Sequence, residues 1–161
     1  MIIFIYFFTH CDSVHEWSLA EGIYQAILEF AKNHDVKKVL EVEIKVGELM
    51  QLDLDLMKEA ILMLAQGSVM EEAEIKLTVE KAAFSCEKCG HEWNFEVAKK
   101  EIEQRVSKDK LIKDDSGSLD LPLHYIPGLV YALATCPKCG SSNILVVRGR
   151  DIKIQKITVE K

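Results

Sequence analysis

Apolar and polar positions along the first half of the chain follow two different periods. Between residues 17 and 33, apolar side chains recur every three or four positions, which predicts an amphipathic helix. Over 38–46 and 74–80 they alternate with polar side chains, which predicts two half-buried strands. Between these strands the helical period returns. A second helix is therefore expected there, starting at an Asp53 or Asp55 cap and ending near Gly67.

The apolar positions also predict which face of each element is buried. In the first strand we expect the buried face to carry Leu40, Val42, Ile44 and Val46. In the second helix we expect the buried stripe to carry Leu56, Ala60, Ile61 and Leu64. A last strand over 151–159 shows a slip in its apolar phase between Ile154 and Ile157, which predicts a β-bulge.

From Ser85 onward the pattern changes to polar turns with few apolar repeats. Residues 96–109 are charged and have helical character, and 113–122 have loop composition. We therefore predict an α+β fold, in which a three-stranded sheet carries two helices on one face and a zinc-ribbon-like domain is inserted. The expected domains are 14–84 plus 149–161 for the sheet and 85–148 for the insertion, which has a flexible insert around 108–122. Residues 1–13 stand apart as an extension.

The composition limits the possible functions. The chain has 161 residues, of which 48% are hydrophobic, and a net charge of −6. This length excludes a large multidomain enzyme, and an acidic chain is a poor candidate for non-specific binding to nucleic acid or anionic membranes. The apolar start, residues 1–8, has no Lys or Arg before it and no small-residue cleavage site after it. We therefore expect a cytoplasmic protein without a signal peptide or membrane span.

Four of the five cysteines form two matched knuckles, C-E-K-C-G and C-P-K-C-G. The four are Cys86, Cys89, Cys136 and Cys139, and Cys11 is left over. Each knuckle turns two thiolates toward one ion, while its glycine takes the positive φ that closes the turn. Four thiolates form a closed tetrahedral site, and we expect structural zinc there. Iron, as in rubredoxin, and redox-active or free thiols are the alternatives.

Four motifs occur in an order that resembles one family. His15 and Glu16 stand directly before the first helix, Gly47-Glu48-Leu49 ends the first strand, and His124-Tyr125-Ile126-Pro127 precedes the second of the two knuckles. From about residue 14 to the C-terminus, the chain resembles the HypA/HybF family of hydrogenase maturation nickel chaperones. The resemblance implies that the α/β domain binds nickel and that zinc is structural.

In that family, nickel is held by the second-residue His, the terminal amine and nearby backbone nitrogens. The matching ligands here are His15, Glu16 and the amine of Val14, with His124 as a further candidate. Because 13 residues precede Val14, we expect that the start was assigned too early and that translation begins at Val14. Amine, imidazole and deprotonated amide nitrogens suit square-planar Ni(II). Affinity is therefore expected to fall below about pH 7.

The resemblance also implies a function without catalysis. Nickel would pass by ligand exchange, with a HypB-type GTPase, to the precursor of the hydrogenase large subunit. The sequence contains neither a phosphate-binding P-loop nor a G-x-S-x-G nucleophile motif. We expect no nucleic-acid or membrane partner, and either a monomer or a domain-swapped dimer. The sequence leaves open which hydrogenase, or whether urease, is served.

The sequence is also compatible with two alternative functions. One is a zinc-ribbon module that binds nucleic acid or a protein machine. Residues 85–150 carry ten basic and nine acidic side chains, which is a weak basic patch for contacting phosphates. The other alternative is a rubredoxin-like electron carrier.

Overall fold

The computed structural model describes residues 5–6, 16–105, 112–113, 119–120 and 129–161. It divides into two compact units. The first unit comprises Met1–Val46, Leu52–Val79 and Asp151–Lys161, and the second comprises Gly47–Gln51 and Glu80–Arg150. The short segment after the first long strand thus belongs to the second unit.

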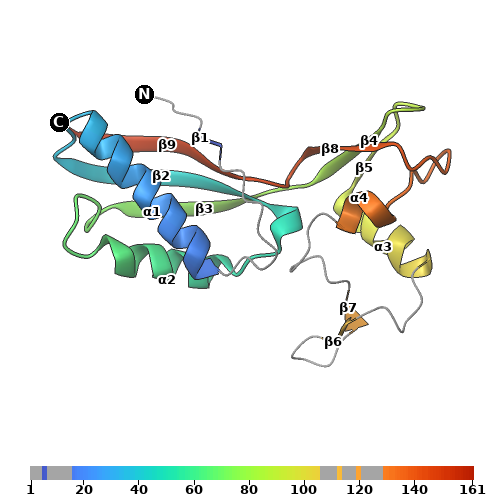
Figure 1. Ribbon diagram of the computed structural model, residues 1–161, viewed down its shortest axis with the longest axis horizontal. Helices are drawn as coiled ribbons and strands as arrows, with labels where there is room; N and C mark the ends of the chain where they lie inside the picture. Colours follow the sequence, from blue (N-terminus) through green and yellow to red (C-terminus); the bar gives the residue numbers. More distant parts are fainter. Residues whose placement is uncertain (1–4, 7–15, 106–111, 114–118, 121–128) are drawn as a thin grey trace. The chain divides into compact units, whose positions relative to one another are not determined.

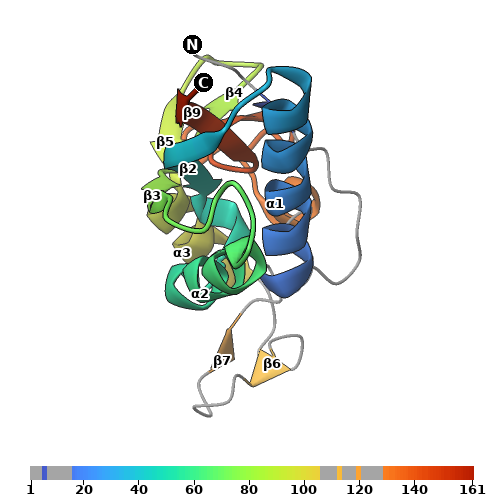
Figure 2. The same ribbon diagram turned by 90° about the vertical axis from the view of Figure 1, so that its left-hand side faces the viewer.

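The first unit is a sheet with two helices on one face (Figures 1 and 2). The helices are α1 (Glu16–Asn33) and α2 (Leu54–Ala65). The sheet has the order β1-β9-β2-β3, with β1 (Ile5–Tyr6), β9 (Ile152–Glu160), β2 (Lys38–Gly47) and β3 (Glu74–Glu80). The predicted α+β architecture of three long strands and two helices is therefore confirmed. The two-residue β1, which pairs antiparallel with β9, is an addition.

The core of the first unit lies between the helices and the sheet. From α1 it takes Leu19, Ala20, Ile23, Ile27, Phe30 and Ala31. From α2 it takes Met57, Ala60, Ile61 and Ala65. The predicted stripe on α2 was therefore wrong at Leu56, which is 37% exposed. Met57 begins the i, i+3, i+4 series that faces the core, and Leu56 lies one position outside it.

A bulge in β2 changes which of its residues are buried. The register between β2 and β9 shifts between Val39 and Glu41 and again between Glu43 and Ile44. The first shift leaves Leu40 without a partner on β9, so that Val39 is fully buried and Leu40 is 42% exposed. The predicted burial of Leu40 was therefore wrong, because strict alternation does not continue across a bulge. At the second shift the extra residue lies on β9, between Ile154 and Ile157. This confirms the bulge predicted there in the last strand.

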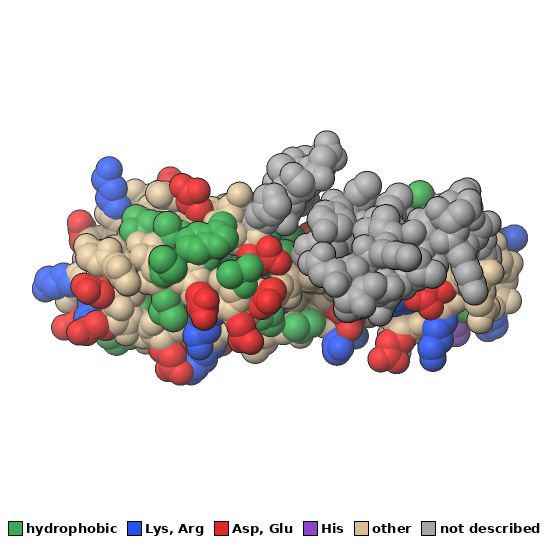
Figure 3. Space-filling view, turned by 90° about the horizontal axis from the view of Figure 1, so that it is seen from below, with side chains coloured by type: hydrophobic (Ala, Val, Ile, Leu, Met, Phe, Trp, Pro, Cys, Tyr) green, Lys and Arg blue, Asp and Glu red, His purple; other side chains and the backbone are tan. Residues whose placement is uncertain are grey.

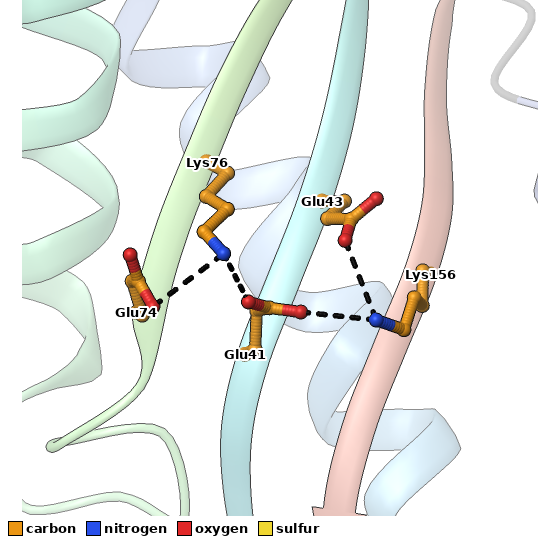
Figure 4. Close-up of polar contacts among 5 residues, drawn as sticks. All are labelled: Glu41, Glu43, Glu74, Lys76 and Lys156. Carbon is orange, nitrogen blue, oxygen red and sulfur yellow. Dashed lines mark hydrogen bonds and ion pairs between the residues drawn. The ribbon is translucent and has the colours of Figure 1, made fainter.

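The face of the sheet that is turned away from α1 carries a network of charged side chains (Figure 4). Glu41 on β2 binds Lys76 on β3, and it also binds Lys156 on β9 at 3.2 Å. Lys156 reaches Glu43 at 3.4 Å as well. Hydrogen bonds from the two lysines are the main cause that lowers the pKa of Glu41. Cross-strand pairs of this kind favour the observed register while keeping the open face polar.

The second unit is built around a smaller sheet with the order β5-β4-β8. Its strands are β4 (Ala83–Cys86), β5 (Glu92–Asn94) and β8 (Ile144–Arg148), and its helices are α3 (Phe95–Arg105) and α4 (Leu129–Leu133). The short strands β6 (Ile112–Lys113) and β7 (Leu119–Asp120) pair with each other inside the predicted insert. The fully buried Phe84, Ala98 and Ile102 lie in one core with Cys86 and Cys136. Two metal-ligand candidates are thus part of the hydrophobic core.

Within the second unit, three backbone segments meet closely. Gly47 ends β2 and precedes the short 3-10 helix η1 (Glu48–Met50). A Cβ on Gly47 would lie 2.4 Å from the backbone of Gly149, and a Cβ on Gly149 would lie 2.4 Å from Cα of Ala82. Gly149 also has a φ of +88°, which L side chains rarely adopt. Glycine is therefore required at both positions.

Some large apolar side chains of the two first-unit helices are exposed, namely Trp17, Leu56, Leu62 and Met63. Figure 3 views the first unit from the α2 side, where hydrophobic side chains lie among acidic and basic ones. Within the described part of the chain, the longest helices are too short or too polar to cross a membrane.

Candidate metal centre

The first cysteine knuckle follows directly from a strand. Cys86 is the last residue of β4, and its backbone N–H donates to the carbonyl of His91 at 2.9 Å. The N–H of Gly90 donates back to the carbonyl of Cys86 at 2.8 Å. Gly90 has a φ of +70°, as the knuckle motif predicts. These bonds close a tight turn that places Cys89 beside Cys86.

The second knuckle repeats this turn. The N–H of Cys136 donates to the carbonyl of Ser141 at 2.8 Å, and the N–H of Gly140 donates to the carbonyl of Cys136 at 2.8 Å. Gly140 has a φ of +71°. Upstream, Thr135 lies outside any strand, and both its N–H and its hydroxyl donate to the carboxylate of Glu101 on α3. The sequence did not single out Glu101, because no local pattern links it to residues 34 positions away.

The two knuckles bring four sulfurs together in one cluster. All four Sγ atoms lie within 4.8 Å of one another. The Sγ atoms of Cys86 and Cys139 are 3.6 Å apart, and those of Cys89 and Cys136 are 3.7 Å apart. A tetrahedral ion with metal–sulfur bonds of about 2.3 Å requires sulfur–sulfur edges of about 3.8 Å. The cluster therefore has the size of a tetrahedral thiolate site, and the cysteines are free rather than disulfide-bonded.

Hydrogen bonds within the cluster separate the acidities of its thiols. Burial acts against ionisation of Cys86, but the N–H groups of Cys89 and Lys88 and the Cys139 thiol outweigh it and lower its pKa to about 7. Cys89 receives a bond from the N–H of His91, yet desolvation and the other three thiols raise its pKa to about 11. Negative charges on sulfurs this close repel each other, so a cation bound among them would favour the thiolate forms.

His91 contributes to this region through its backbone and its ring. Its imidazole stacks on Trp93 with ring centroids 5.9 Å apart, and Trp93 in turn stacks on Phe84 at 5.9 Å. Within the described residues, the group able to hold a metal consists of the four cysteines without a histidine. The donor set is therefore all sulfur, which fits zinc or iron.

The second predicted metal site lies at the start of α1, in the first unit. Glu16 is the first residue of α1, and its Oε1 accepts the backbone N–H of Asp53 at 3.2 Å. Asp53 itself caps α2, because its side chain accepts the N–H groups of Asp55 and Leu56 at 3.0 Å each. The N-termini of the two helices therefore lie side by side. The remaining predicted nickel residues, Val14, His15 and His124, lie outside the described residues, as do His10 and Cys11.

Glu48, from the Gly-Glu-Leu motif, has a structural partner within the second unit. Its carboxylate accepts the backbone N–H of Ala82 at 2.8 Å and binds the Lys81 ammonium at 2.7 Å. The N–H of the next residue, Leu49, donates to the carbonyl of Gly149 at 2.9 Å. Glu48 therefore joins the segment after β2 to the segment before β4.

Comparison with known proteins gives one consistent family. The family model described as "Hydrogenase/urease nickel incorporation, metallochaperone, hypA" matches residues 14–159. The hydrogenase maturation factor HypA of Thermococcus onnurineus is 36% identical over 148 residues, which cover 92% of this chain and 97% of that protein. HypA of Pyrococcus horikoshii is 35% identical over 148 residues, with the same coverage.

Two solved structures share the fold. The solution structure of the nickel metallochaperone HypA from Helicobacter pylori matches 91% of this chain and 97% of its own, with a TM-score of 0.53 and 19% identity. Another solution structure of HypA protein matches 92% and 98%, with a TM-score of 0.55 and 20% identity. From the family match over nearly the whole chain and the identity to these relatives, the chain belongs to the HypA family of nickel metallochaperones.

Proposed function

We infer that this protein carries Ni(II) to the precursor of a nickel enzyme during its maturation, with a [NiFe]-hydrogenase as the expected recipient. The observation that carries this proposal is the family match across residues 14–159. It is supported by the cluster of four cysteines, whose all-sulfur donor set is suited to a resident metal ion. The segment that leads into α1 is the proposed site for nickel.

The cysteine cluster suits a resident zinc ion. Cys86, Cys89, Cys136 and Cys139 would hold it, and zinc there would hold two distant chain segments together. A site with four protein ligands has no open coordination position. This cluster is therefore suited to maintaining the fold, and the transferred nickel is expected to bind elsewhere.

The nickel cargo is expected at the segment before α1. His15 would supply its imidazole, and the amine of Val14 would join it if translation begins there. Because the Glu16 carboxylate already accepts the N–H of Asp53, Glu16 would contribute its backbone nitrogen rather than its side chain. Nitrogen donors of this kind suit square-planar Ni(II), and a site at a chain terminus leaves the metal accessible for exchange.

Transfer would proceed by ligand exchange and would need no catalytic residue. A HypB-type GTPase and the hydrogenase large-subunit precursor are the proposed partners. The proposed place of action is the cytoplasm.

Calorimetric Ni(II) titration of the zinc-loaded protein tests the nickel site. Two versions are compared, one of 161 residues and one in which Met replaces Val14 as the first residue. Tight binding by the shortened version alone, abolished by His15→Ala, would support the terminal-amine site. The matched control is His34→Ala, because the imidazole of His34 contacts the Phe30 carbonyl at 2.9 Å and packs on the Phe30 ring at the far end of α1.

Two other results are informative. Equal binding by both versions would exclude the terminal amine as a ligand and direct attention to internal ligands such as His10 or His124. Absence of tight binding in both versions, with circular dichroism showing intact folds, would refute nickel carriage by this chain.

A further inference from the structure

The two knuckles differ in how their incoming backbone is held. Ser85, directly before Cys86, lies in the middle strand of the small sheet and is paired with Glu92 on one side and Leu145 on the other. Thr135, directly before Cys136, belongs to no strand. The first knuckle is therefore fixed by strand pairing, and the second needs another support.

That support is a single carboxylate. Glu101 on α3 accepts the backbone N–H of Thr135 at 3.1 Å through one oxygen and the Thr135 hydroxyl at 2.5 Å through the other. Hydrogen bonds to a charged acceptor are shorter and stronger than those between neutral groups. Both donors of Thr135 are thus held by one group immediately before a cysteine of the cluster.

The helix that carries Glu101 is itself firmly placed. Phe95, Ala98 and Ile102 of α3 are at most 6% exposed and lie in the same core as Cys86 and Cys136. Glu101 directly precedes Ile102 in sequence, so its carboxylate extends from an anchored part of the helix. A rigid helix can therefore position the backbone of Thr135.

We propose that Glu101 is a positioning residue of the metal centre: by holding Thr135 it fixes the second knuckle and slows release of the ion bound by the four cysteines. Partners that surround metal ligands commonly alter metal affinity by about 10- to 100-fold when they are removed. The proposal rests on the assignment of the cysteine cluster as a metal site and is independent of the nickel segment.

Cobalt(II) provides a spectroscopic test in the full chain. The thiolate-to-cobalt charge-transfer absorption of the cobalt-loaded wild-type protein first establishes whether the cysteines bind a metal. Its decay after excess EDTA is added then gives the release rate. Glu101→Gln, which keeps one acceptor oxygen, and Thr135→Val, which removes the hydroxyl, are each expected to accelerate release by roughly tenfold. Glu103→Gln is the matched control, because Glu103 is an exposed glutamate on the same helix.

Coupling between the two residues separates positioning from general destabilisation. The double variant Glu101→Gln/Thr135→Val is expected to release cobalt no faster than the faster single variant. Both changes act on the same contact, the hydrogen bond between the Thr135 hydroxyl and the Glu101 carboxylate. A purely structural Glu101 would lower the unfolding midpoint and leave the release rate under native conditions unchanged. Glu101→Ala, which removes both acceptor oxygens, is expected to release faster than Glu101→Gln.

The outcomes distinguish the positioning role of Glu101 from the metal site itself. Wild-type release rates in the folded Glu101→Gln and Thr135→Val variants would overturn the positioning role, while the cysteine site would stand. Additive acceleration in the double variant would also overturn it, because the two side chains would then act separately. Absence of thiolate–cobalt absorption in the wild type would overturn both the positioning role and the metal site.

Discussion

Removing the metal from the cysteine cluster is expected to destabilise the second unit strongly. Zinc would join Cys86 to Cys139 and close a loop of about 50 residues. The chain-entropy expression for a cross-link gives about 4 kcal/mol for a loop of that length. The second unit has fewer than eighty residues, and the core of so small a domain typically supplies only about 3–5 kcal/mol. Loss of the cross-link therefore removes about half of the stabilisation of the unit.

The measurement is urea unfolding of the zinc-loaded and the chelator-treated protein in a Trp17→Phe background. Trp93, which is 7% exposed and stacked on Phe84, then reports on the second unit alone. We expect chelation to move its transition to a much lower urea concentration, with the transition of α1 and α2 followed by circular dichroism little changed. Cys139→Ser should reproduce this shift without chelator. An unchanged Trp93 transition after complete zinc removal would refute the reasoning.

Three further predictions concern stability. Gly149→Ala should destabilise the protein by roughly 3 kcal/mol, through its positive φ and the close approach to Ala82, and a thermal midpoint equal to the wild type would contradict it. Asp53→Ala should cost about 1 kcal/mol by removing the cap of α2 in a denaturant titration, and Asp53→Asn should cost less because its amide oxygen still accepts. The third follows from Glu41, whose pKa is lowered in the folded protein from its ordinary 4.5. This carboxylate adds stability above pH 4.5 and loses that contribution as the pH falls through its lowered pKa. Glu41→Gln should therefore lower the urea midpoint at pH 7, and the difference should shrink at acid pH or in 1 M salt; a pH-independent difference would argue against the network.

Periodicity in the sequence was enough to predict the two helices and three long strands of the first unit. These elements, and a cap of α2 at Asp53 or Asp55, follow from local patterns, since each depends on residues within a few positions of one another. The slip between Ile154 and Ile157 predicted a bulge for the same reason. The structure shows that the cap is Asp53. Leu40 was placed wrongly because its exposure depends on a register shift against another strand, for which its own segment carries no signal.

The candidate metal centre was predictable in its ligands and not in its support. Two C-x-x-C-G knuckles identify four thiolates whatever the intervening chain does, because each turn is closed by its own hydrogen bonds. The contact between Glu101 and Thr135 joins residues 34 positions apart. No periodic pattern marks a pair separated by that distance, so only the folded chain reveals it.

The sequence by itself determined the helices and long strands of the first unit, the four candidate cysteine ligands and the family, because these depend on local spacing and on motifs in a fixed order. The tertiary structure decided which glutamates act as supports: Glu16 for Asp53, Glu48 for Ala82 and Glu101 for Thr135. In each pair a carboxylate accepts a backbone N–H that lies more than thirty residues away in the chain. The carboxylate that meets each N–H is chosen by the packing of helices and strands, which no short stretch of sequence specifies.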